Sequence, residues 1–223
     1  MCASQMSEVR VVGSMKFSVS RSTRSLGSIF IVVSWLAASG PVQATTLCAT
    51  AAQGERIRAA FTAENSPVLH QVAARLGMSE AMVLSGLGIE RAYGVEGRYF
   101  TDVWKKLESW QTAVVVVMKA GHVFETHGPI QPGEPSKRSN FFNLHGHKDG
   151  MSGHLRPDLV GAIYVVSLPG NDEILRGVLF YDAAGDIAFG VYVPGEGDTP
   201  PPGLIKQFEQ TRKEIRTLSA LCP

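Results

Sequence analysis

The feature that most constrains the fold of this chain is a series of apolar, β-branched runs between residues 112 and 193. Short segments rich in small and polar residues separate these runs, as in Ala183-Ala184-Gly185-Asp186. Runs of this kind predict strands, and short connections make sequential strands antiparallel neighbours. The predicted strands cover residues 112–118, 122–127, 140–145, 159–168, 174–182 and 187–193.

Helical patterns precede and follow the predicted sheet. Between residues 51 and 111 apolar residues recur at steps of three and four, and Gly77 and Ser79 mark the end of one helix and the start of the next. Residues 194–203 form a predicted Pro/Gly-rich linker before an amphipathic helix over 204–221. The predicted fold class is α+β, with N-terminal helices, a large antiparallel β-sheet and a C-terminal helix. The expected organisation is a domain over 51–223, with helices in 51–111 and the sheet in 112–193, after a signal-like or unstructured extension of residues 1–50.

The first 44 residues have the pattern of a secretory signal. Lys16, Arg21 and Arg24 precede an apolar run over residues 26–38, and Val42-Gln43-Ala44 supplies small residues before a cleavage point. The run is shorter than the roughly 20 apolar residues of a membrane span, so we expect no stable membrane insertion. The alternative interpretation is a misassigned start codon, in which case this stretch has no role in export.

The three cysteines, Cys2, Cys48 and Cys222, do not form a disulfide framework or a closely spaced zinc site. Cleavage after Ala44 would leave two thiols near the chain ends. In an oxidising periplasm these two are expected to form a disulfide that connects the start of the first helix to the end of the last. In the cytoplasm the same pair would stay reduced.

Charge excludes a strongly electrostatic nucleic-acid binder. The chain has 21 basic and 20 acidic side chains, a net charge of +1, which gives no general attraction to phosphates. Residues 51–90 have the outline of a helix-turn-helix, but the would-be recognition helix over 79–87 holds no Lys or Arg. It lacks the donors that phosphates and guanine edges require. We therefore expect these helices to pack on the sheet, and we expect no nucleic-acid partner.

Histidine is the distinctive reactive residue of this chain. The sequence lacks the common signatures of serine hydrolases, phosphate-binding loops and zinc proteases. Three of the six histidines, His145, His147 and His154, fall within residues 140–156. They are either the ligands of a zinc or iron ion or solvated residues of a glycine-rich loop.

His154 considered alone favours a different ligand. Gly150 and Gly153 flank it and allow the backbone to approach a flat molecule closely. Arg156 lies on the same side of an extended chain and offers a planar donor for a carboxylate. The apolar strand that carries Met118 would add a wall and a thioether. These groups match what haem requires, namely axial ligands, a propionate partner and ring packing.

Several motifs resemble those of the intracellular haem-utilisation carriers of the HutX/ChuX type, which are relatives of the HemS-like haem-trafficking proteins. The resemblance covers about residues 51–220, and its most specific motif is Gly150-Met-Ser-Gly-His-Leu-Arg156. Further matching motifs are Asp102-Val-Trp-Lys-Lys-Leu107 with Trp110, Gly-His-Val-Phe-Glu125, Phe142-Asn-Leu144, Phe180-Tyr-Asp182 and Phe189-Gly-Val-Tyr-Val193.

The resemblance implies a homodimeric carrier that binds haem b. His154 matches the family's histidine in the glycine–histidine motif and is implied as the ligand of the haem iron. Met118 aligns with a position that can be histidine in the family, so it either ligates as a thioether or packs on the porphyrin with water opposite His154. His127 is the substitute ligand, and Arg156 is the expected propionate partner.

A carrier needs no catalytic step, so we expect binding and release of haem between unknown donor and acceptor proteins. The alternative from another class is an enzyme that degrades or reduces haem, because related folds act in haem breakdown. A second alternative is a DNA-binding regulator that uses residues 51–90. The resemblance implies a cytoplasmic location, and a real signal in residues 15–44 would instead imply the periplasm.

Overall fold

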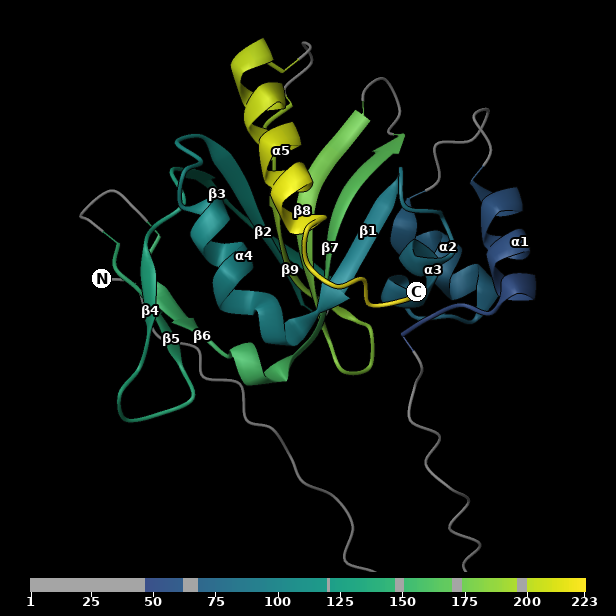
Figure 1. Cartoon of the computed structure of the whole chain (residues 1–223), viewed down its shortest axis with the longest axis horizontal. Coiled ribbons are helices and arrows are strands. Elements are labelled where there is room, and N and C mark those ends of the chain that lie inside the picture. The colour runs from purple at the N-terminus through teal and green to yellow at the C-terminus, as the bar shows by residue number, and fades with distance from the viewer. Residues whose placement is uncertain (1–46, 62–67, 120, 147–150, 170–173, 196–199) are drawn as a thin grey trace, which may run out of the picture. The chain divides into compact units, whose positions relative to one another are not determined.

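Two β-sheets and two groups of helices make up the described part of the chain (Figure 1). The structure is a computed structural model and describes residues 47–61, 68–119, 121–146, 151–169, 174–195 and 200–223. The signal-like segment and its predicted cleavage point lie outside these residues. No helix within the described ranges is both long enough and apolar enough to cross a membrane.

The large sheet has six antiparallel strands in the order β1-β7-β8-β9-β2-β3. Its strands are β1 (Ala92–Glu96), β2 (Ala113–Lys119), β3 (His122–Gly128), β7 (Val160–Pro169), β8 (Ile174–Asp182) and β9 (Ile187–Tyr192). All but β1 were expected from their β-branched runs. The prediction that this region belongs to the helical part is wrong. This strand is short, contains Gly94 and pairs with the distant β7, so no local pattern marks it.

A second sheet has three antiparallel strands, β4 (Gly133–Pro135), β5 (Phe142–Leu144) and β6 (Gly153–Leu155). Only β5 falls inside a predicted extended segment. The other two strands are three residues long and rich in glycine or proline. His154 lies in β6, opposite Asn143 of β5.

The helices are α1 (Ala51–Ala60), α2 (Leu69–Leu76), α3 (Glu80–Ser85), α4 (Phe100–Leu107) and α5 (Pro202–Ile215), with 3₁₀ turns at Gly97–Tyr99 and Pro157–Leu159. Gly77 ends α2 in the left-handed conformation, at φ 64°, and the Ser79 hydroxyl accepts a hydrogen bond from the Met82 amide at the start of α3. Both predicted boundaries are therefore confirmed. The last helix ends at Ile215 and not at residue 221 as predicted.

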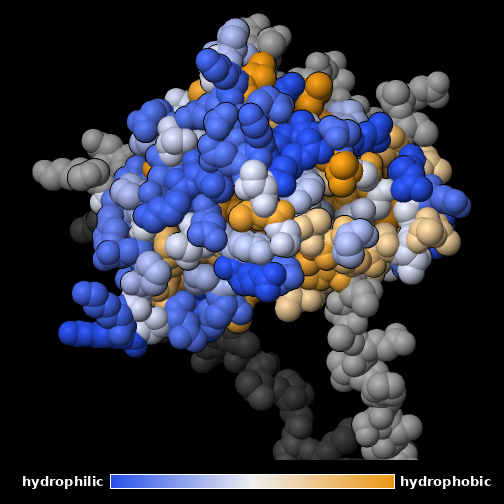
Figure 2. Space-filling view, viewed as in Figure 1, coloured by the Kyte–Doolittle hydropathy of each residue, from blue (hydrophilic) through white to orange (hydrophobic). Residues whose placement is uncertain are grey.

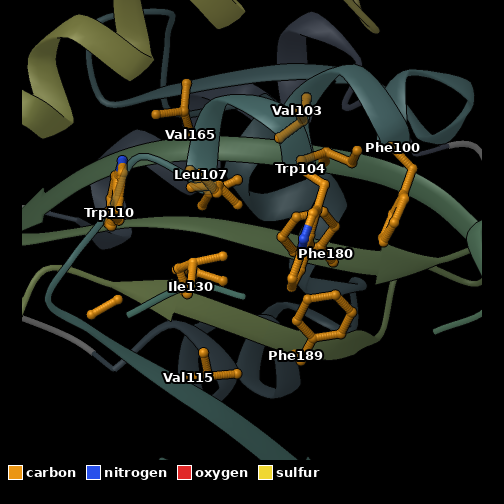
Figure 3. Packing of buried hydrophobic residues seen from close by; sticks show 14 of the residues in the cluster. Phe100, Val103, Trp104, Leu107, Trp110, Val115, Ile130, Val165, Phe180 and Phe189 are labelled. Atoms are coloured by element: carbon orange, nitrogen blue, oxygen red, sulfur yellow. The ribbon is translucent and has the colours of Figure 1, made fainter. Parts of the chain in front are cut away.

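One face of the large sheet packs against α4, α5 and the small sheet. The centre of this core is aromatic: Trp104 of α4 lies among Phe100, Phe180 and Phe189, and the last two rings stack with centroids 4.4 Å apart (Figure 3). Phe142 of the small sheet enters the same core, its ring 5.4 Å from that of Phe100. The outer surface of α4 and α5 is mostly hydrophilic (Figure 2), as expected for amphipathic helices.

The opposite face carries α1, α2 and α3. Ile57, Val83 and Leu84 of these helices are fully buried in one cluster with Tyr164 and Tyr181 of the sheet. The expectation that the N-terminal helices pack their apolar faces on the sheet is therefore confirmed. The helices α1–α3 therefore form a layer on this face of the sheet.

The C-terminal tail covers the outer edge of β1. The Leu221 amide donates to the Gly94 carbonyl at 2.8 Å, and the Tyr93 hydroxyl donates to the Leu218 carbonyl at 2.8 Å. A disulfide joins Cys222 to Cys48 across a Cα–Cα distance of 5.7 Å. The pair that the sequence analysis expected in an oxidising compartment is thus within bonding geometry in the folded chain.

Candidate functional site

A pocket of about 380 Å³ lies on the half of the large sheet formed by β2, β3 and β9. This volume falls within the range of small-molecule sites, roughly 300–1,000 Å³. The pocket is lined by Val114, Val116, Met118, Glu125, His127, Ile174, Leu175, Tyr192, Val193, Pro194, Gly195 and Pro200. Most of these side chains are apolar, and Glu125, His127 and Tyr192 are the polar ones.

Strand alternation places the pocket on the face opposite α4. Ala113 and Val115 of β2 are buried in the core beside α4, so Val114, Val116 and Met118 project from the other face. The core under α1–α3 contains sheet residues from β1, β7 and β8. Among the described segments, the helices therefore leave the β2 and β9 part of this face open, and this part is the pocket floor.

Met118 and His127 lie in this same pocket. His127 pairs with Val114 across the β2–β3 hairpin, so both side chains project from one face. Met118 stands four residues further along β2, a separation of about 13 Å at the usual strand rise. The Nε2 atom of His127 lies 3.8 Å from a carboxylate oxygen of Glu125. The hairpin thus places two potential ligands, a thioether and an imidazole, on one face of the sheet.

Tyr192 forms the wall between the pocket and the core under α1–α3. Burial, and next the negative charge of Glu80, raise the pKa of Tyr192 to about 12. Its phenol is therefore neutral near pH 7. Tyr192 and the proline-rich segment after β9 are not among the site residues predicted from the sequence, although Tyr192 belongs to the Phe189–Val193 motif.

His154 is exposed on the small sheet and has a defined partner. Its Nδ1 atom lies 2.8 Å from the side-chain oxygen of Asn143. Because an amide oxygen only accepts, Nδ1 carries the proton in the neutral ring and the lone pair is on Nε2. Partners of this kind fix the tautomer and orientation of metal-binding histidines. Phe141 supports the ring from the side, with centroids 5.7 Å apart.

Arg156 lies near His154 and is already paired. Its guanidinium makes two hydrogen bonds to Asp158, at 2.8 and 2.7 Å, and it stacks over the Phe141 ring at 5.6 Å. Hydrogen bonding from Arg156 holds the pKa of Asp158 at about 2. Arg156, the predicted hydrogen-bond donor to a propionate, is therefore already in bidentate contact with the Asp158 carboxylate.

The four predicted site residues fall into two groups on opposite sides of the large sheet. Met118 and His127 line the pocket, whereas His154 and Arg156 lie on or beside the small sheet, which packs against the α4 side through Phe142. Within one copy of the chain these groups do not converge. Sequence spacing could not show this, because the separation depends on which side of the large sheet the small sheet packs.

A mononuclear site of three histidines does not form among the described residues. No group of three His, Cys, Asp or Glu side chains within the described ranges is placed to hold a metal ion. His145 instead lies 3.4 Å from a carboxylate oxygen of Glu134. His147 lies outside the described residues.

Comparisons with known proteins agree on the type of fold. Residues 94–211 match the family described as haem utilisation ChuX/HutX. The intracellular heme transport protein HutX of Vibrio cholerae is 26% identical over 124 residues, which are 55% of this chain and 62% of that protein. This chain therefore spans less than two thirds of that relative's length.

Two solved structures have the same fold at low sequence identity. The heme-binding protein ChuX is 20% identical with a TM-score of 0.63, and the match covers 73% of this chain and 98% of that one. The heme-binding protein PhuS of Pseudomonas aeruginosa, in its holo form, is 16% identical with a TM-score of 0.60. That match covers 75% of this chain but 46% of PhuS, so the shared unit takes up less than half of the PhuS chain.

Proposed function

The chain belongs to the haem utilisation ChuX/HutX family, and on this premise we propose that it is a carrier that binds haem and passes it on without a required catalytic step. The bound form we propose is haem b, which has two propionates and no covalent link to the protein. The observation that carries this proposal is the apolar pocket with Met118 and His127 on its floor. Apolar walls and a small number of potential axial ligands are the features that a haem site needs.

We propose His154 as the principal axial ligand. Its side chain is exposed, and Asn143 holds the Nδ1 side of the ring at 2.8 Å. This hydrogen bond leaves the Nε2 lone pair directed away from the strand pair, as an iron ligand requires. Met118 or His127 would then act as a weaker second ligand or as a packing group.

The open geometry suits a carrier. The helices that the structure describes leave the pocket side of β2 and β9 uncovered, and the side chain of His154 is exposed. A ligand held by one firm axial bond and an open apolar wall can be handed to an acceptor, whereas a closed pocket retains it. We therefore propose reversible haem binding, with the donor and acceptor proteins still to be identified.

We also propose a homodimer. Strand β3 is an outer strand of the sheet and all its residues up to His127 are exposed. An outer strand of this kind is normally covered or paired.

Titration with haemin tests the proposed function. We expect the wild-type protein to bind haemin with a shifted Soret band. We expect His154→Ala to bind it much more weakly or with a different spectrum, because the proposed iron ligand is lost. His145→Ala is the matched control, since His145 is also an exposed histidine on the small-sheet segment. An unchanged spectrum and affinity in His154→Ala would show that another residue ligates the iron.

We propose that the carrier acts in the cytoplasm. The compartment fixes the state of the Cys48–Cys222 pair, because cytoplasmic thiols stay reduced and exported ones are oxidised. Fractionation of cells that express a C-terminally tagged chain, followed by alkylation of free thiols, measures both properties at once. We expect a cytoplasmic band with two reactive thiols from this pair. A mature chain that begins at Thr45 without free thiols would establish export instead.

A further inference from the structure

We infer that the Cys48–Cys222 pair is a reversible redox switch that locks the C-terminal tail on the edge of β1. The tail consists of residues 216–223, which follow the end of α5. In the oxidised chain the disulfide holds the tail in place, and in the reduced chain the tail can detach from β1. The switch needs a low-molecular-weight disulfide as its oxidant, and it is independent of the proposed haem binding.

Non-covalent contacts position the tail without help from the disulfide. The tail passes beside β1 (Figure 1), where the Leu221 amide donates to the Gly94 carbonyl at 2.8 Å. The Tyr93 hydroxyl donates to the Leu218 carbonyl, also at 2.8 Å. These bonds fix the chain up to the residue before Cys222.

The segment around Cys48 is held by a separate set of contacts. The Ala49 amide donates to the Ser85 hydroxyl oxygen at 2.8 Å, and Leu47 packs against the core under α1–α3. With both segments docked, the Cα atoms of Cys48 and Cys222 are 5.7 Å apart, within bonding range. The folded chain has therefore already lost the loop-closure entropy that opposes this bond in the unfolded chain.

The chemistry of the switch is thiol–disulfide exchange. Both cysteines are partly exposed, so a small disulfide such as glutathione disulfide can reach them. One cysteine thiolate attacks a sulfur of glutathione disulfide, which breaks that bond, forms a mixed disulfide and releases one glutathione. The second thiolate then attacks the protein sulfur of the mixed disulfide and releases the other glutathione. Two protein thiols are oxidised, one glutathione disulfide is reduced, and the two thiol protons pass through water to the two glutathiones.

The two redox states differ in what holds the tail. The last residues of a chain open most easily, because few contacts hold them. In the oxidised chain, detachment of the tail also requires the segment around Cys48 to leave its place beside α3. Oxidation therefore keeps the edge of β1 covered, whereas reduction allows an unpaired edge to form.

Equilibration in glutathione buffers tests the reversibility of the switch. Cys2, which lies outside the described residues, is changed to Ser in every sample so that one pair reacts. We expect complete conversion in both directions, with an oxidation constant about 30- to 1,000-fold larger in the folded chain than in urea. Equal constants would show that the fold does not bring the thiols together. A disulfide that excess glutathione fails to reduce would be a permanent bond, and either result would overturn the inference.

A variant of the tail contact tests the proposed cause. Tyr93→Phe removes the hydrogen bond to the Leu218 carbonyl, so we expect the oxidation constant of the folded chain to fall about threefold to tenfold. Tyr192→Phe is the matched control, because it removes a phenol hydroxyl from the pocket wall and should leave the constant unchanged. Thermal melting checks that both variants fold. An unchanged constant in Tyr93→Phe would contradict positioning of Cys222 by the docked tail.

Amide hydrogen exchange measures the lock itself. The Leu221 amide should exchange at least about tenfold faster in the reduced chain than in the oxidised chain. The His145 amide, which donates to the Pro132 carbonyl at 2.9 Å on the small-sheet segment, is the control and should exchange at the same rate in both states. The same rate at Leu221 in both states would show that the disulfide does not lock the tail.

Discussion

The two outer strands of the large sheet differ in what covers their outer edges. On the β1 side the tail adds a bridge between Val95 and Ala220, hydrogen bonds to Tyr93 and Gly94, and the Cys48–Cys222 disulfide. On the β3 side the described chain adds no further strand, and Phe124 is 64% exposed. The first edge is closed by the chain itself, and the second is open to another molecule.

This difference separates stability from function within one sheet. The closed half contains the helices α1–α3, the tail and the disulfide, and no residue of these elements is among those that line the pocket. The open half contains the pocket, Met118 and His127. Changes in the closed half should therefore alter unfolding, and changes in the open half should alter binding or association with little effect on unfolding.

The largest expected effect is at Gly97, beside the closed edge. A Cβ at this position would overlap the carbonyl oxygen of Val160, which is backbone and cannot rotate away. We expect Gly97→Ala to lower the free energy of unfolding by about 3 kcal/mol or more. Urea denaturation measures it. Gly153→Ala is the control, because its Cβ meets no atom within 4 Å, and a change there larger than about 0.5 kcal/mol would contradict this account.

Loss of the disulfide should have the next largest effect. Cys48 and Cys222 are separated by 174 residues in sequence, and closing a long loop restricts the unfolded chain. We expect the free energy of unfolding of the oxidised wild-type protein to be about 2–4 kcal/mol higher than that of Cys222→Ser. Reductant should lower the wild type to the level of the variant and leave the variant unchanged. Equal stability of the oxidised and reduced wild type would contradict this prediction.

The closed half should also lose stability as pH rises. Burial, and next the negative charge of Asp186, raise the pKa of Glu80 in the folded chain from 4.5 to about 7. The folded state binds this proton more tightly than the unfolded state, so the stability that Glu80 contributes is fully present below pH 4.5 and is lost as pH rises to about 7. Because Glu80 is only half-buried, we expect a loss of about 1–2 kcal/mol.

Chemical denaturation at several pH values measures this slope. Glu80→Gln should flatten it, because the amide does not titrate. The exposed Glu55, changed to Gln, is the control and should keep the wild-type slope. A slope that persists unchanged in Glu80→Gln would assign the effect to another group.

The smallest effect on stability is expected at the open edge. Phe124→Ser removes a side chain that is already largely in solvent, so the free energy of unfolding should change by no more than about 0.5 kcal/mol. Sedimentation should nevertheless show weaker self-association, since the aromatic ring lies on the edge proposed for the second copy. Ile89 is 60% exposed and lies just before β1, at the opposite edge of the sheet. Ile89→Ser should therefore alter neither the free energy of unfolding nor self-association.

Local patterns were sufficient to predict most elements of this fold. Gly77 and Ser79 fix the boundary between α2 and α3 because their preferences depend on the adjacent backbone. The β7–β8–β9 meander was predictable because its strands are β-branched and closely spaced. By contrast, β1 forms by pairing with a strand about 70 residues away. The tail after Ile215 is not helical because it pairs with β1. Neither contact has a local sequence signal.

The candidate site was predictable only as a set of residue types. The motif around His154 identifies a histidine of interest, and alternation along β2 places Met118 on one sheet face. Which face the small sheet covers depends on Phe142 packing against Phe100, a contact between residues 42 positions apart. The sequence therefore indicated potential haem ligands without indicating that they lie on opposite sides of the sheet.

The bond between Cys48 and Cys222 has a mechanical consequence when it is formed. It converts residues 48–222 into a closed covalent ring. A pulling force applied at Pro223 then passes through one sulfur–sulfur bond to Cys48 and bypasses every strand of the sheet. Any machine that unfolds proteins by threading them from one end would have to admit two chain segments side by side or wait for reduction.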